Sequence, residues 1–299
     1  MRVNDTPRRA VTAERELSKM EHADRFLLAG VMGWPVMHSR SPMLHNYWFS
    51  QYGLSGSYVP LAIRPERLQA ALRALHPLGF SGCNLTIPHK QQAMTIVDSV
   101  DTVARRIGAI SCVVVNPDGL LAGSNNDCYG FIENVRQSQP NWRADAGPVM
   151  VIGAGGGARA VCYALAEAGA TEIRLVNRSV ARARAIADDF GDPVHVLPWE
   201  QRHDALEDVA MVVNATSQGM VGQPALDIGL DRLPRHALAA DIVYIPLETP
   251  FLAAARERGN PTVNGLGMLL HQARPAWNAW FGIEPAVTAE LRAMVEQTI

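Results

Sequence analysis

The sequence predicts an α/β protein of two domains. Its 299 residues are enough for two hydrophobic cores. Segments with strand and helix patterns alternate from Phe26 onwards, which is typical of βαβ units and parallel sheets. Near the middle of the chain, the glycine-rich segment Gly153–Gly157 follows an apolar run and leads directly into a helix-forming stretch.

The first half of the chain predicts a largely parallel sheet. A hairpin signal follows the alternating segments, with Asn116–Gly119 as its turn. The expected strands are 27–32, 58–63, 82–87, 110–115 and 120–122, and the expected helices are 42–52, 65–75, 90–97 and 128–139.

The second half predicts a further α/β unit. The polar segment 139–147 indicates a boundary between domains. We expect a first domain at 26–140 and a second at 148–265, with two closing helices beyond it. The expected strands of the second half are 150–152, 173–176, 194–197, 211–214, 240–243 and 262–264, and the closing helices are 267–281 and 285–297.

Bulk properties argue against several classes of protein. The formal net charge of −2 gives no basic footprint for nucleic acid. The four cysteines lack CxxC or Cys/His metal spacing, so a reduced protein without a metal is expected. Residues 1–25 form a polar extension with no apolar signal segment, and no apolar run approaches the roughly 20 residues that span a bilayer. We therefore expect a soluble, cytoplasmic protein whose extension forms an arm or a surface helix.

The glycine-rich segment has the pattern of a dinucleotide-binding turn. Gly153, Gly155 and Ala158 fit the G-x-G-x-x-G/A spacing, with a strand pattern before them and a helix pattern after them. Such a turn lets backbone N–H groups and a helix N-terminus approach a pyrophosphate. The second domain is therefore expected to be of the Rossmann type.

The end of the next strand indicates which dinucleotide binds. An NAD enzyme usually places an acid there to hold the ribose 2′-hydroxyl. This chain instead has Arg178, Ser179 and Arg182, and a guanidinium can stack on adenine and bind a 2′-phosphate. The alternative is an ordinary solvated helix start. We favour NADP as the cofactor.

Two residues are candidates for proton transfer. Lys90 falls in the first turn of an expected helix, where the dipole disfavours the ammonium and is expected to lower the lysine pKa. The alternative is a solvated surface lysine. Asp127, just before the helix 128–139, is the expected partner, and its alternative role is that of a helix N-cap.

Hydroxyl groups after the first strand suggest a site for a carboxylate. Ser39 and Ser41 can point together, whereas Ser41 can alternatively cap a helix whose first position is Pro42. The ligand is expected to lie between the two domains, outside the carboxyl ends of the strands. No metal site is expected, and the histidines nearby, His38, His45 and His89, are interpreted as structural.

From Phe26 nearly to the C-terminus, the chain resembles the shikimate dehydrogenase family. Members of that family reduce 3-dehydroshikimate to shikimate, reversibly, with NADPH. The matching motifs are GWPVMHSRSPMLHN (33–46), NLTIPHK (84–90), GSNNDCYGF (123–131), GAGGGARA (153–160), NRSVARA (177–183), NATSQGM (214–220), DIVYIPLETP (241–250) and GLGMLLHQ (265–272).

The resemblance implies roles for residues at the matching positions. Lys90 and Asp127 correspond to the catalytic pair. The closing helices (267–299) are implied to complete the first, substrate-binding domain. The implied substrate-binding residues are Ser39, Ser41 and Tyr244 for the carboxylate and Asn84, Thr86 and Gln272 for the ring hydroxyls; the implied NADP-binding residues are Gly153, Ala154, Gly155, Gly156, Gly157, Ala158, Asn177, Arg178, Ser179, Arg182, Thr216, Ser217, Ile242, Gly265 and Met268.

The chain departs from the family pattern beside the substrate. Ser111-Cys112 stands where Asn-Thr is usual, and Asn126 stands where Thr is usual. A serine is shorter than asparagine, so Ser111 is expected to reach the ring through water and to discriminate less among hydroxyl patterns. The implied function is NADP-dependent shikimate dehydrogenase, acting on a small cyclic hydroxy acid as a monomer or homodimer. The alternatives are a dehydrogenase of quinate or an aminoshikimate, a non-catalytic NADP-binding regulator and, less favoured, a folate-type dehydrogenase.

Overall fold

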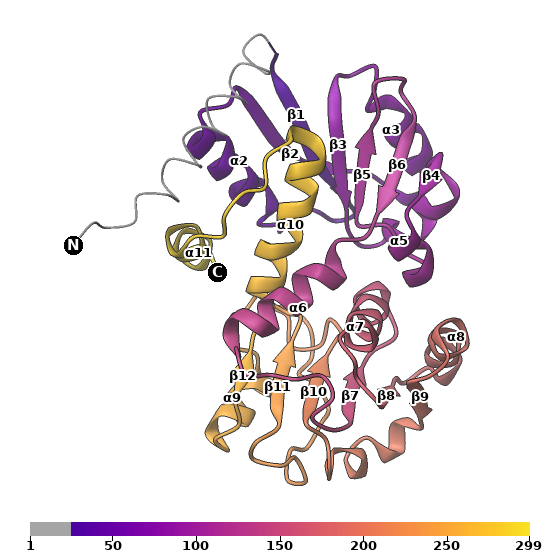
Figure 1. Cartoon of the computed structure of the whole chain (residues 1–299), viewed down its shortest axis with the longest axis vertical. Coiled ribbons are helices and arrows are strands. Elements are labelled where there is room, and N and C mark those ends of the chain that lie inside the picture. Colours follow the sequence, from indigo (N-terminus) through magenta and orange to yellow (C-terminus); the bar gives the residue numbers. More distant parts are fainter. Residues whose placement is uncertain (1–24) are drawn as a thin grey trace, which may run out of the picture. The chain divides into compact units, whose positions relative to one another are not determined.

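The computed structural model describes residues 25–299, so the expected polar extension lies outside the described residues except for Arg25. The contacts divide the chain into two compact units. Unit 1 runs up to Asp101 and includes Ala109–Ser124 and Ala273–Val295, and unit 2 comprises Thr102–Gly108, Asn125–Gln272 and Glu296–Ile299. Each unit contains one β-sheet flanked by helices, so the expected α/β class is confirmed (Figure 1).

Unit 1 has a mixed sheet, which we name sheet A. Among the described residues it has six strands in the order β2-β1-β3-β5-β6-β4, and only β5 runs antiparallel to its neighbours. The expected hairpin is confirmed, because the Gly119 N–H donates to the Asn116 carbonyl at 2.8 Å between β5 and β6. The strands are β1 (Leu27–Gly33), β2 (Gly56–Ala62), β3 (Phe80–Leu85), β4 (Ser99–Val100), β5 (Cys112–Val115) and β6 (Leu121–Ser124).

The helices that follow the first strands match the expected positions with one exception. The segment expected as one helix at 90–97 is a single α-turn, α4 (His89–Gln92), followed by the 3₁₀ turn η2 (Ala93–Thr95). The other helical elements before β5 are α2 (Ser41–Tyr52), η1 (Pro65–Arg67) leading into α3 (Leu68–Ala74), and α5 (Thr102–Ile107), which belongs to unit 2.

An aromatic cluster forms part of the core of unit 1. Trp48 and Trp277 are 1% and 0% exposed, and the Phe49 ring lies 4.6 Å from the Trp277 ring. The imidazole of His45 stacks on Tyr58, with ring centroids 4.0 Å apart and planes 9° from parallel. Because aromatic side chains bury large apolar areas, this cluster holds α2 and α10 (Leu266–Phe281) against the sheet.

Unit 2 has a fully parallel sheet, which we name sheet B. Among the described residues its strand order is β12-β11-β10-β7-β8-β9, and every neighbouring pair is parallel. Numbered within the unit, this is the order 3-2-1-4-5-6 of a Rossmann domain, so the expected type is confirmed. The strands are β7 (Val149–Ile152), β8 (Ile173–Val176), β9 (Val194–Leu197), β10 (Met211–Asn214), β11 (Leu238–Asp241) and β12 (Thr262–Val263).

The strand order places a topological switch point between β7 and β10. From β7 the chain continues to β8 on one side of this pair, and from β10 it continues to β11 on the other side. Ligands of such sheets typically bind outside the carboxyl ends of the two strands where the order reverses. The remaining elements are the helices α6 (Asp127–Ser138), α7 (Gly156–Glu167), α8 (Val180–Phe190), α9 (Pro250–Glu257) and α11 (Ala289–Glu296), and the 3₁₀ turns η3 (Trp199–Gln201) and η4 (Asp204–Leu206).

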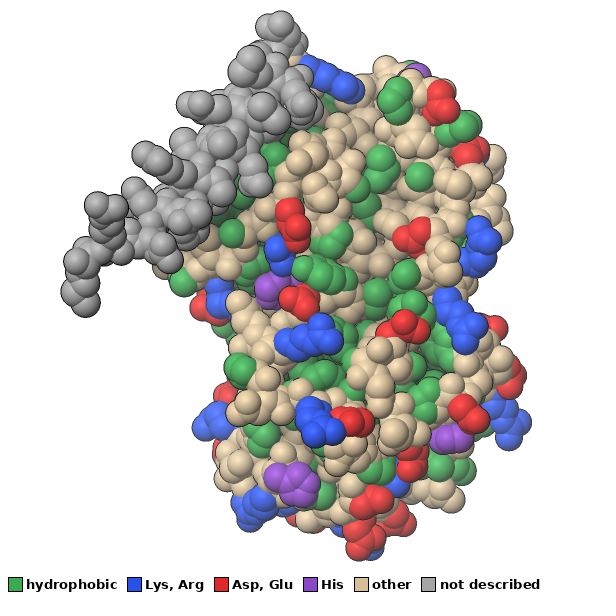
Figure 2. Space-filling view, in the orientation of Figure 1, with side chains coloured by type: hydrophobic (Ala, Val, Ile, Leu, Met, Phe, Trp, Pro, Cys, Tyr) green, Lys and Arg blue, Asp and Glu red, His purple; other side chains and the backbone are tan. Residues whose placement is uncertain are grey.

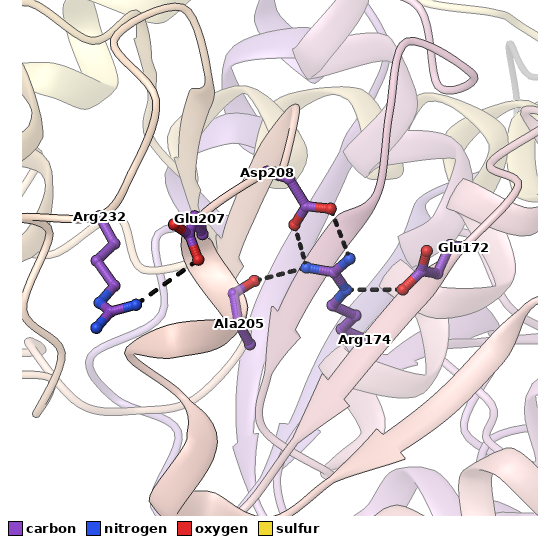
Figure 3. A network of polar contacts seen from close by, with 6 residues as sticks. All are labelled: Glu172, Arg174, Ala205, Glu207, Asp208 and Arg232. Carbon is purple, nitrogen blue, oxygen red and sulfur yellow. Dashed lines mark hydrogen bonds and ion pairs between the residues drawn. The ribbon is translucent and has the colours of Figure 1, made fainter.

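One arginine fastens the β9–β10 connection to sheet B. Arg174 of β8 donates to Glu172 at 2.7 Å, to the Ala205 carbonyl at 3.0 Å and to both carboxylate oxygens of Asp208 (Figure 3). The Arg174 side chain is 15% exposed, and these partners raise its pKa further above its ordinary value. A second ion pair joins Glu207 of the same connection to Arg232 of the β10–β11 connection.

The visible surface shows no preference for one sign of charge. Over residues 25–299, Figure 2 shows acidic and basic side chains intermixed on the face in view. Within the same residues, no helix is both long enough and apolar enough to span a membrane.

Candidate active site

The glycine-rich turn after β7 is built to approach a ligand. Gly153 has φ 121°, and a Cβ there would lie 2.7 Å from the Ala215 carbonyl oxygen, so only glycine fits. A Cβ on Gly155 would meet nothing within 4 Å, which leaves open space before α7. No side chain caps the N-terminus of α7, so its first N–H groups remain without a side-chain acceptor. This cradle fits the pyrophosphate of a dinucleotide.

Other residues implied to bind the cofactor gather around the same turn. A Cβ on Gly157 would lie 2.7 Å from Ile242 Cδ1, and Gly265 lies directly against the Ile242 carbonyl. The Gly265 N–H donates to the Val243 carbonyl at 3.0 Å. Thus the structure brings together the start of α7, the end of β11 and the start of α10, with Met268 half-buried on that last helix.

The residues implied to bind the adenosine phosphate lie beside the glycine-rich turn. The Gly153 N–H donates to the Val176 carbonyl at 2.8 Å, which joins the turn to the end of β8. Asn177 follows, and its amide donates to the Ser179 carbonyl at 2.8 Å. Ser179 is the N-cap of α8 but makes no side-chain cap hydrogen bond.

Arg178 and Arg182 are exposed at this edge of sheet B. Neither forms an ion pair within residues 25–299. Two exposed guanidinium groups beside an open glycine turn suit a phosphate on the adenosine ribose, and an acidic side chain is absent from the Asn177–Ser179 segment. Exposure alone is also what the solvated-helix alternative requires.

The loop after β10 forms the other side of the switch point. Thr216 and Ser217 follow the last residue of that strand, Asn214, whose side-chain oxygen accepts from the Thr216 N–H and hydroxyl at 3.1 and 2.7 Å. Asn214 in turn contacts Asp241 at the end of β11. Burial raises the pKa of Asp241 to about 6, against the opposing effect of three hydrogen-bond donors.

In unit 1, four implied substrate residues share one hydrogen-bonded cluster. Asn84, 5% exposed at the end of β3, accepts from the Tyr58 hydroxyl at 2.7 Å and donates to the Ser111 carbonyl at 3.1 Å. Each half of its amide keeps capacity for one more hydrogen bond. Tyr58 also hydrogen-bonds Ser41, and the Ser39 hydroxyl accepts from the Ser41 N–H at 3.2 Å.

The capping alternative for Ser41 is wrong. Helix α2 begins at Ser41 itself, its N-cap is Arg40, and no side chain makes the cap hydrogen bond. The Ser41 hydroxyl therefore faces the Tyr58–Asn84 cluster rather than closing the helix end. The sequence could not show this, because the position of a helix start is uncertain by one or two residues.

Lys90 and Thr86 lie just beyond β3. Thr86 packs against Gly33, and its carbonyl accepts from the His89 N–H at 2.8 Å. Lys90 is half-buried in the first turn of α4, and its carbonyl accepts from the Ile110 N–H at 2.8 Å, next to Ser111. A helix of four residues carries only a short dipole, so the dipole argument has less support than the expected longer helix would have given.

Ser111 is almost fully buried, with 2% of its surface exposed. Its N–H donates to the Ser124 carbonyl at 2.9 Å, and its own carbonyl is held by Asn84 and by the Leu85 N–H. The backbone at this position is therefore fixed from both sides. Serine in place of the asparagine usual at position 111 therefore changes only the hydrogen bonds that the side chain can donate and accept.

The remaining implied residues lie in unit 2. Asp127 is 4% exposed and is the first residue of α6, after Asn126 at the N-cap, so the N-cap alternative for Asp127 is wrong. Its N–H donates to Asn125 Oδ1 at 3.0 Å. Gln272 lies beside the first turn of α6, because a Cβ on Gly130 would be 2.7 Å from its Cβ. Tyr244 is half-buried after β11.

Sequence reasoning overlooked three features of these sites. The Tyr58 hydroxyl donates to Asn84, and Tyr58 is the only buried residue of β2, where the sequence signal was a single tyrosine in an expected strand. Asp241 was treated only as part of a motif, although a lone acid ends an otherwise apolar strand. Lys90 is also one of only two lysines in the chain, beside Lys19, among 27 lysines and arginines. A lysine in a suitable environment can give up its proton near neutral pH, whereas an arginine cannot. A lysine at position 90 of an arginine-rich chain is therefore a chemical signal.

Comparison with known proteins decides the family. The model of the shikimate dehydrogenase substrate binding domain matches residues 31–113, and that of shikimate / quinate 5-dehydrogenase matches residues 136–243. A shikimate dehydrogenase (NADP(+)) of Paramagnetospirillum magneticum is 55% identical over 268 residues, covering 90% of this chain and 97% of that protein. The chain belongs to the shikimate dehydrogenase family.

Solved structures of the family have the same fold. The shikimate 5-dehydrogenase of Thermus thermophilus, in complex with NADP(H) and shikimate, has a TM-score of 0.82 and 35% identity, covering 92% of this chain and 100% of that one. The quinate dehydrogenase of Corynebacterium glutamicum, in complex with NAD, has a TM-score of 0.85 and 31% identity, covering 92% and 99%. The family therefore includes members that differ in substrate and cofactor.

Proposed function

We propose that this shikimate dehydrogenase family member catalyses the reversible, NADP-dependent reduction of 3-dehydroshikimate to shikimate. One observation carries the proposal. In a chain 55% identical to a shikimate dehydrogenase (NADP(+)), the only lysine of residues 25–299, Lys90, is joined through its carbonyl to the N–H of Ile110, the neighbour of Ser111 in the Asn84 cluster.

The substrate-binding residues implied by the resemblance supply binding and orientation. Ser39 and Ser41, with Tyr244, hold the substrate carboxylate, and Asn84, Thr86 and Gln272 hydrogen-bond the ring hydroxyls. The Ser111 carbonyl can only accept, so it fixes which half of the Asn84 amide donates, and the Tyr58 hydroxyl donates to the other half; one N–H and one lone pair of the amide remain for the ligand. Such preorganisation lowers the entropic cost of placing the reacting carbon.

Proton transfer is assigned to Lys90. NADPH, when bound, supplies a hydride to the C3 carbonyl carbon. The Lys90 ammonium donates a proton to the carbonyl oxygen as it becomes a hydroxyl, and its neutral amine is reprotonated from solvent. Asp127 is proposed to orient Lys90 and share its proton. Strand β6 ends at Ser124, three residues before Asp127. Ser124 pairs with Cys112, and Cys112 pairs in turn with Asn84.

Unit 2 is proposed to hold the cofactor across its switch point. The α7 N-terminus and the glycine-rich turn take the pyrophosphate, and Arg178, Ser179 and Arg182 take the adenosine phosphate. Thr216, Ser217, Ile242, Gly265 and Met268 line the remaining length. The domain division that follows from this assignment, 26–140 with 267–299 for substrate and 148–265 for NADP, is part of the proposal.

Ser111 favours a second candidate, a dehydrogenase of quinate or an aminoshikimate. The usual asparagine can both donate to and accept from ring hydroxyls, whereas a buried serine offers one short hydroxyl. A pocket with one polar contact fewer rejects an altered ring less strongly. The expected consequence for the main proposal is a shikimate dehydrogenase with reduced discrimination.

A panel of initial rates tests the proposal. Oxidation of shikimate, quinate and an aminoshikimate is measured with NADP and with NAD. We expect the highest kcat/KM for shikimate with NADP. A higher kcat/KM for quinate or the amino compound would replace the substrate, and tight NADPH binding without turnover on any of them would indicate a regulator. Action in the cytoplasm as a monomer or homodimer is proposed from the resemblance alone, and the mass in solution tests the second part.

A further inference from the structure

Asp241 is a buried carboxylate that has no cationic partner among residues 25–299. It ends β11, is 2% exposed, and accepts from the Val243 N–H at 2.9 Å, from the Thr249 hydroxyl at 2.7 Å and from the Asn214 amide at 3.1 Å to each oxygen. Burying a carboxylate among neutral donors costs free energy, and burial accordingly raises the pKa of Asp241 to about 6. Because the burial of this carboxylate costs free energy of folding, we expect one of its contacts to serve the site.

The contacts of Asn214 lead from Asp241 to the next loop. Asn214 Nδ2 donates to Asp241 and to the Gln218 carbonyl at 3.0 Å, while Oδ1 accepts from the Thr216 N–H and hydroxyl. The Thr216 hydroxyl in turn accepts from the Gln218 N–H at 2.9 Å. If the amide were flipped, its oxygen would face the Asp241 carboxylate and its N–H groups would face the Thr216 N–H. The Asp241 carboxylate therefore holds Asn214, and through it the loop, in one orientation.

This loop is one wall of the glycine-rich turn. The Ala215 N–H donates to the Ile152 carbonyl at 2.8 Å, and the Ala215 carbonyl oxygen lies 2.7 Å from the position of a Cβ on Gly153. On its far side, Gly219 packs against Thr249, which caps α9 through the Leu252 N–H. A change in the Asn214 amide would therefore displace the backbone beside the glycine-rich turn. Arg178, at the end of β8, lies away from this contact.

We propose that Asp241 is a positioning residue for the cofactor: through Asn214, its carboxylate holds the 216–218 loop in the conformation that binds the nicotinamide half of NADP(H). This inference rests on the proposed NADP-dependent function. It assigns Asp241 no contact with the cofactor and no proton transfer.

Binding of two ligands distinguishes a positioning role of Asp241 from a general loss of structure in unit 2. NADPH spans the whole crevice, whereas adenosine 2′,5′-bisphosphate occupies only the adenosine side. In Asp241→Asn, an N–H₂ group replaces one acceptor and opposes the donors of Asn214, Val243 or Thr249. We expect the Kd for NADPH, measured by calorimetry, to rise about tenfold or more, and the Kd for the bisphosphate to stay within about twofold.

Asn260→Ala is the matched control. Asn260 is a buried amide at the opposite edge of sheet B, where it donates to the Pro234 and Ala237 carbonyls at 2.7 and 3.0 Å. This variant is expected to lose stability while both dissociation constants stay unchanged. Equal weakening of both ligands by Asp241→Asn, or no weakening of NADPH, would overturn the inference.

A second variant covers failure of the first to fold. Asn214→Ala breaks the path to the loop but leaves Asp241 its donors Val243 and Thr249, and the same selective loss of NADPH is expected. If it binds NADPH with the wild-type Kd, the inference is overturned. A wild-type protein that binds neither ligand would instead contradict the proposed function, and the positioning role would fall with it.

Discussion

Lys90 is the residue on which the proposed chemistry depends. It stands half-buried in an arginine-rich chain, and its carbonyl accepts from the Ile110 N–H. We predict that Lys90→Ala lowers kcat by about 10²- to 10⁴-fold, the usual contribution of a general acid or base, with little change in the Kd for NADPH. Steady-state kinetics and calorimetry measure the two quantities.

Lys90→Arg is the informative companion variant. It keeps a positive charge and the length of the side chain, but a guanidinium does not release its proton near neutral pH. We expect it to bind shikimate and to remain as slow as Lys90→Ala. If either variant keeps a kcat near that of the wild type, the assignment of proton transfer to Lys90 is wrong.

His45 makes the stability of unit 1 depend on pH. The imidazole is fully buried between aromatic rings, neither ring nitrogen has a hydrogen-bond partner within residues 25–299, and burial lowers its pKa to about 3. The unfolded chain binds a proton near its ordinary pKa of about 6.5, while the folded chain does not. The stabilising effect of the neutral ring is thus complete above pH 6.5 and is lost as the pH falls towards 3.

We predict that lowering the pH from 7 to 5 reduces the free energy of unfolding of unit 1 by about 2 kcal/mol through His45. His45→Phe is expected to remove this part of the pH dependence. Urea unfolding followed by tryptophan fluorescence measures it, because Trp48, Trp277 and Trp280 surround the ring. His38→Phe, at an exposed position, is the control and should retain the wild-type dependence. Identical pH profiles for wild type and His45→Phe would refute the argument.

At the scale of single residues, the sequence identified chemical types better than exact positions. It picked out Ser41 and Asp127, but their alternative roles as helix caps depended on where a helix begins, which pattern alone places only to within one or two residues. Tyr58 and Asp241 were overlooked because their importance comes from pairing across strands, Tyr58 with Asn84 and Asp241 with Asn214. Such pairs appear only when the sheet order is known.

At the scale of elements, strong periodicity was predictable and short elements were not. The strands of sheet B were expected nearly at their observed bounds, because parallel buried strands are continuous apolar runs. Helices α5 and α9 and the two-residue strand β4 were missed. A signal for α9 was available, since Thr249 and Pro250 form an N-cap followed by proline at the helix start.

The fastening of the β9–β10 connection by Arg174 gives a prediction at this scale. The guanidinium joins β8 to η4 and to Asp208, with 15% of its side chain exposed. We predict that Arg174→Met lowers the free energy of unfolding by about 1–3 kcal/mol, because it removes several charged hydrogen bonds and leaves the Ala205 carbonyl without this donor. Chemical denaturation measures the change.

Arg143→Met is the matched control for Arg174→Met. Arg143 also binds a carboxylate with two hydrogen bonds, to Asp145, but its side chain is 73% exposed. Exposed ion pairs contribute little, so no measurable change is expected. Equal losses in the two variants would show that burial is not what makes the Arg174 contacts effective.

At the scale of the whole molecule, the sequence predicted the fold class because two independent signals agreed. Alternating segments indicated parallel sheets, and the glycine-rich turn indicated where the switch point of sheet B lies. Composition alone would have supported no more than two α/β domains. The observed division is interleaved, with α5 in unit 2 and Ala273–Val295 in unit 1, and such exchanges between units leave no local pattern in the chain.

The assignment of substrate to sheet A and cofactor to sheet B predicts separable effects of the two ligands. A ligand that binds only the folded form protects the segments it contacts, by about 2.7 kcal/mol at 100 times its Kd. Hydrogen exchange should therefore show that NADP+ alone protects 153–158 and 214–218, and that shikimate alone protects 39–41 and 84–90. A largely exposed surface segment of each unit, 64–67 or 256–259, serves as the internal reference. If NADP+ alone protected 84–90 and left 153–158 unchanged, the cofactor would bind elsewhere than at the switch point, and the division of labour between the two sheets would be wrong.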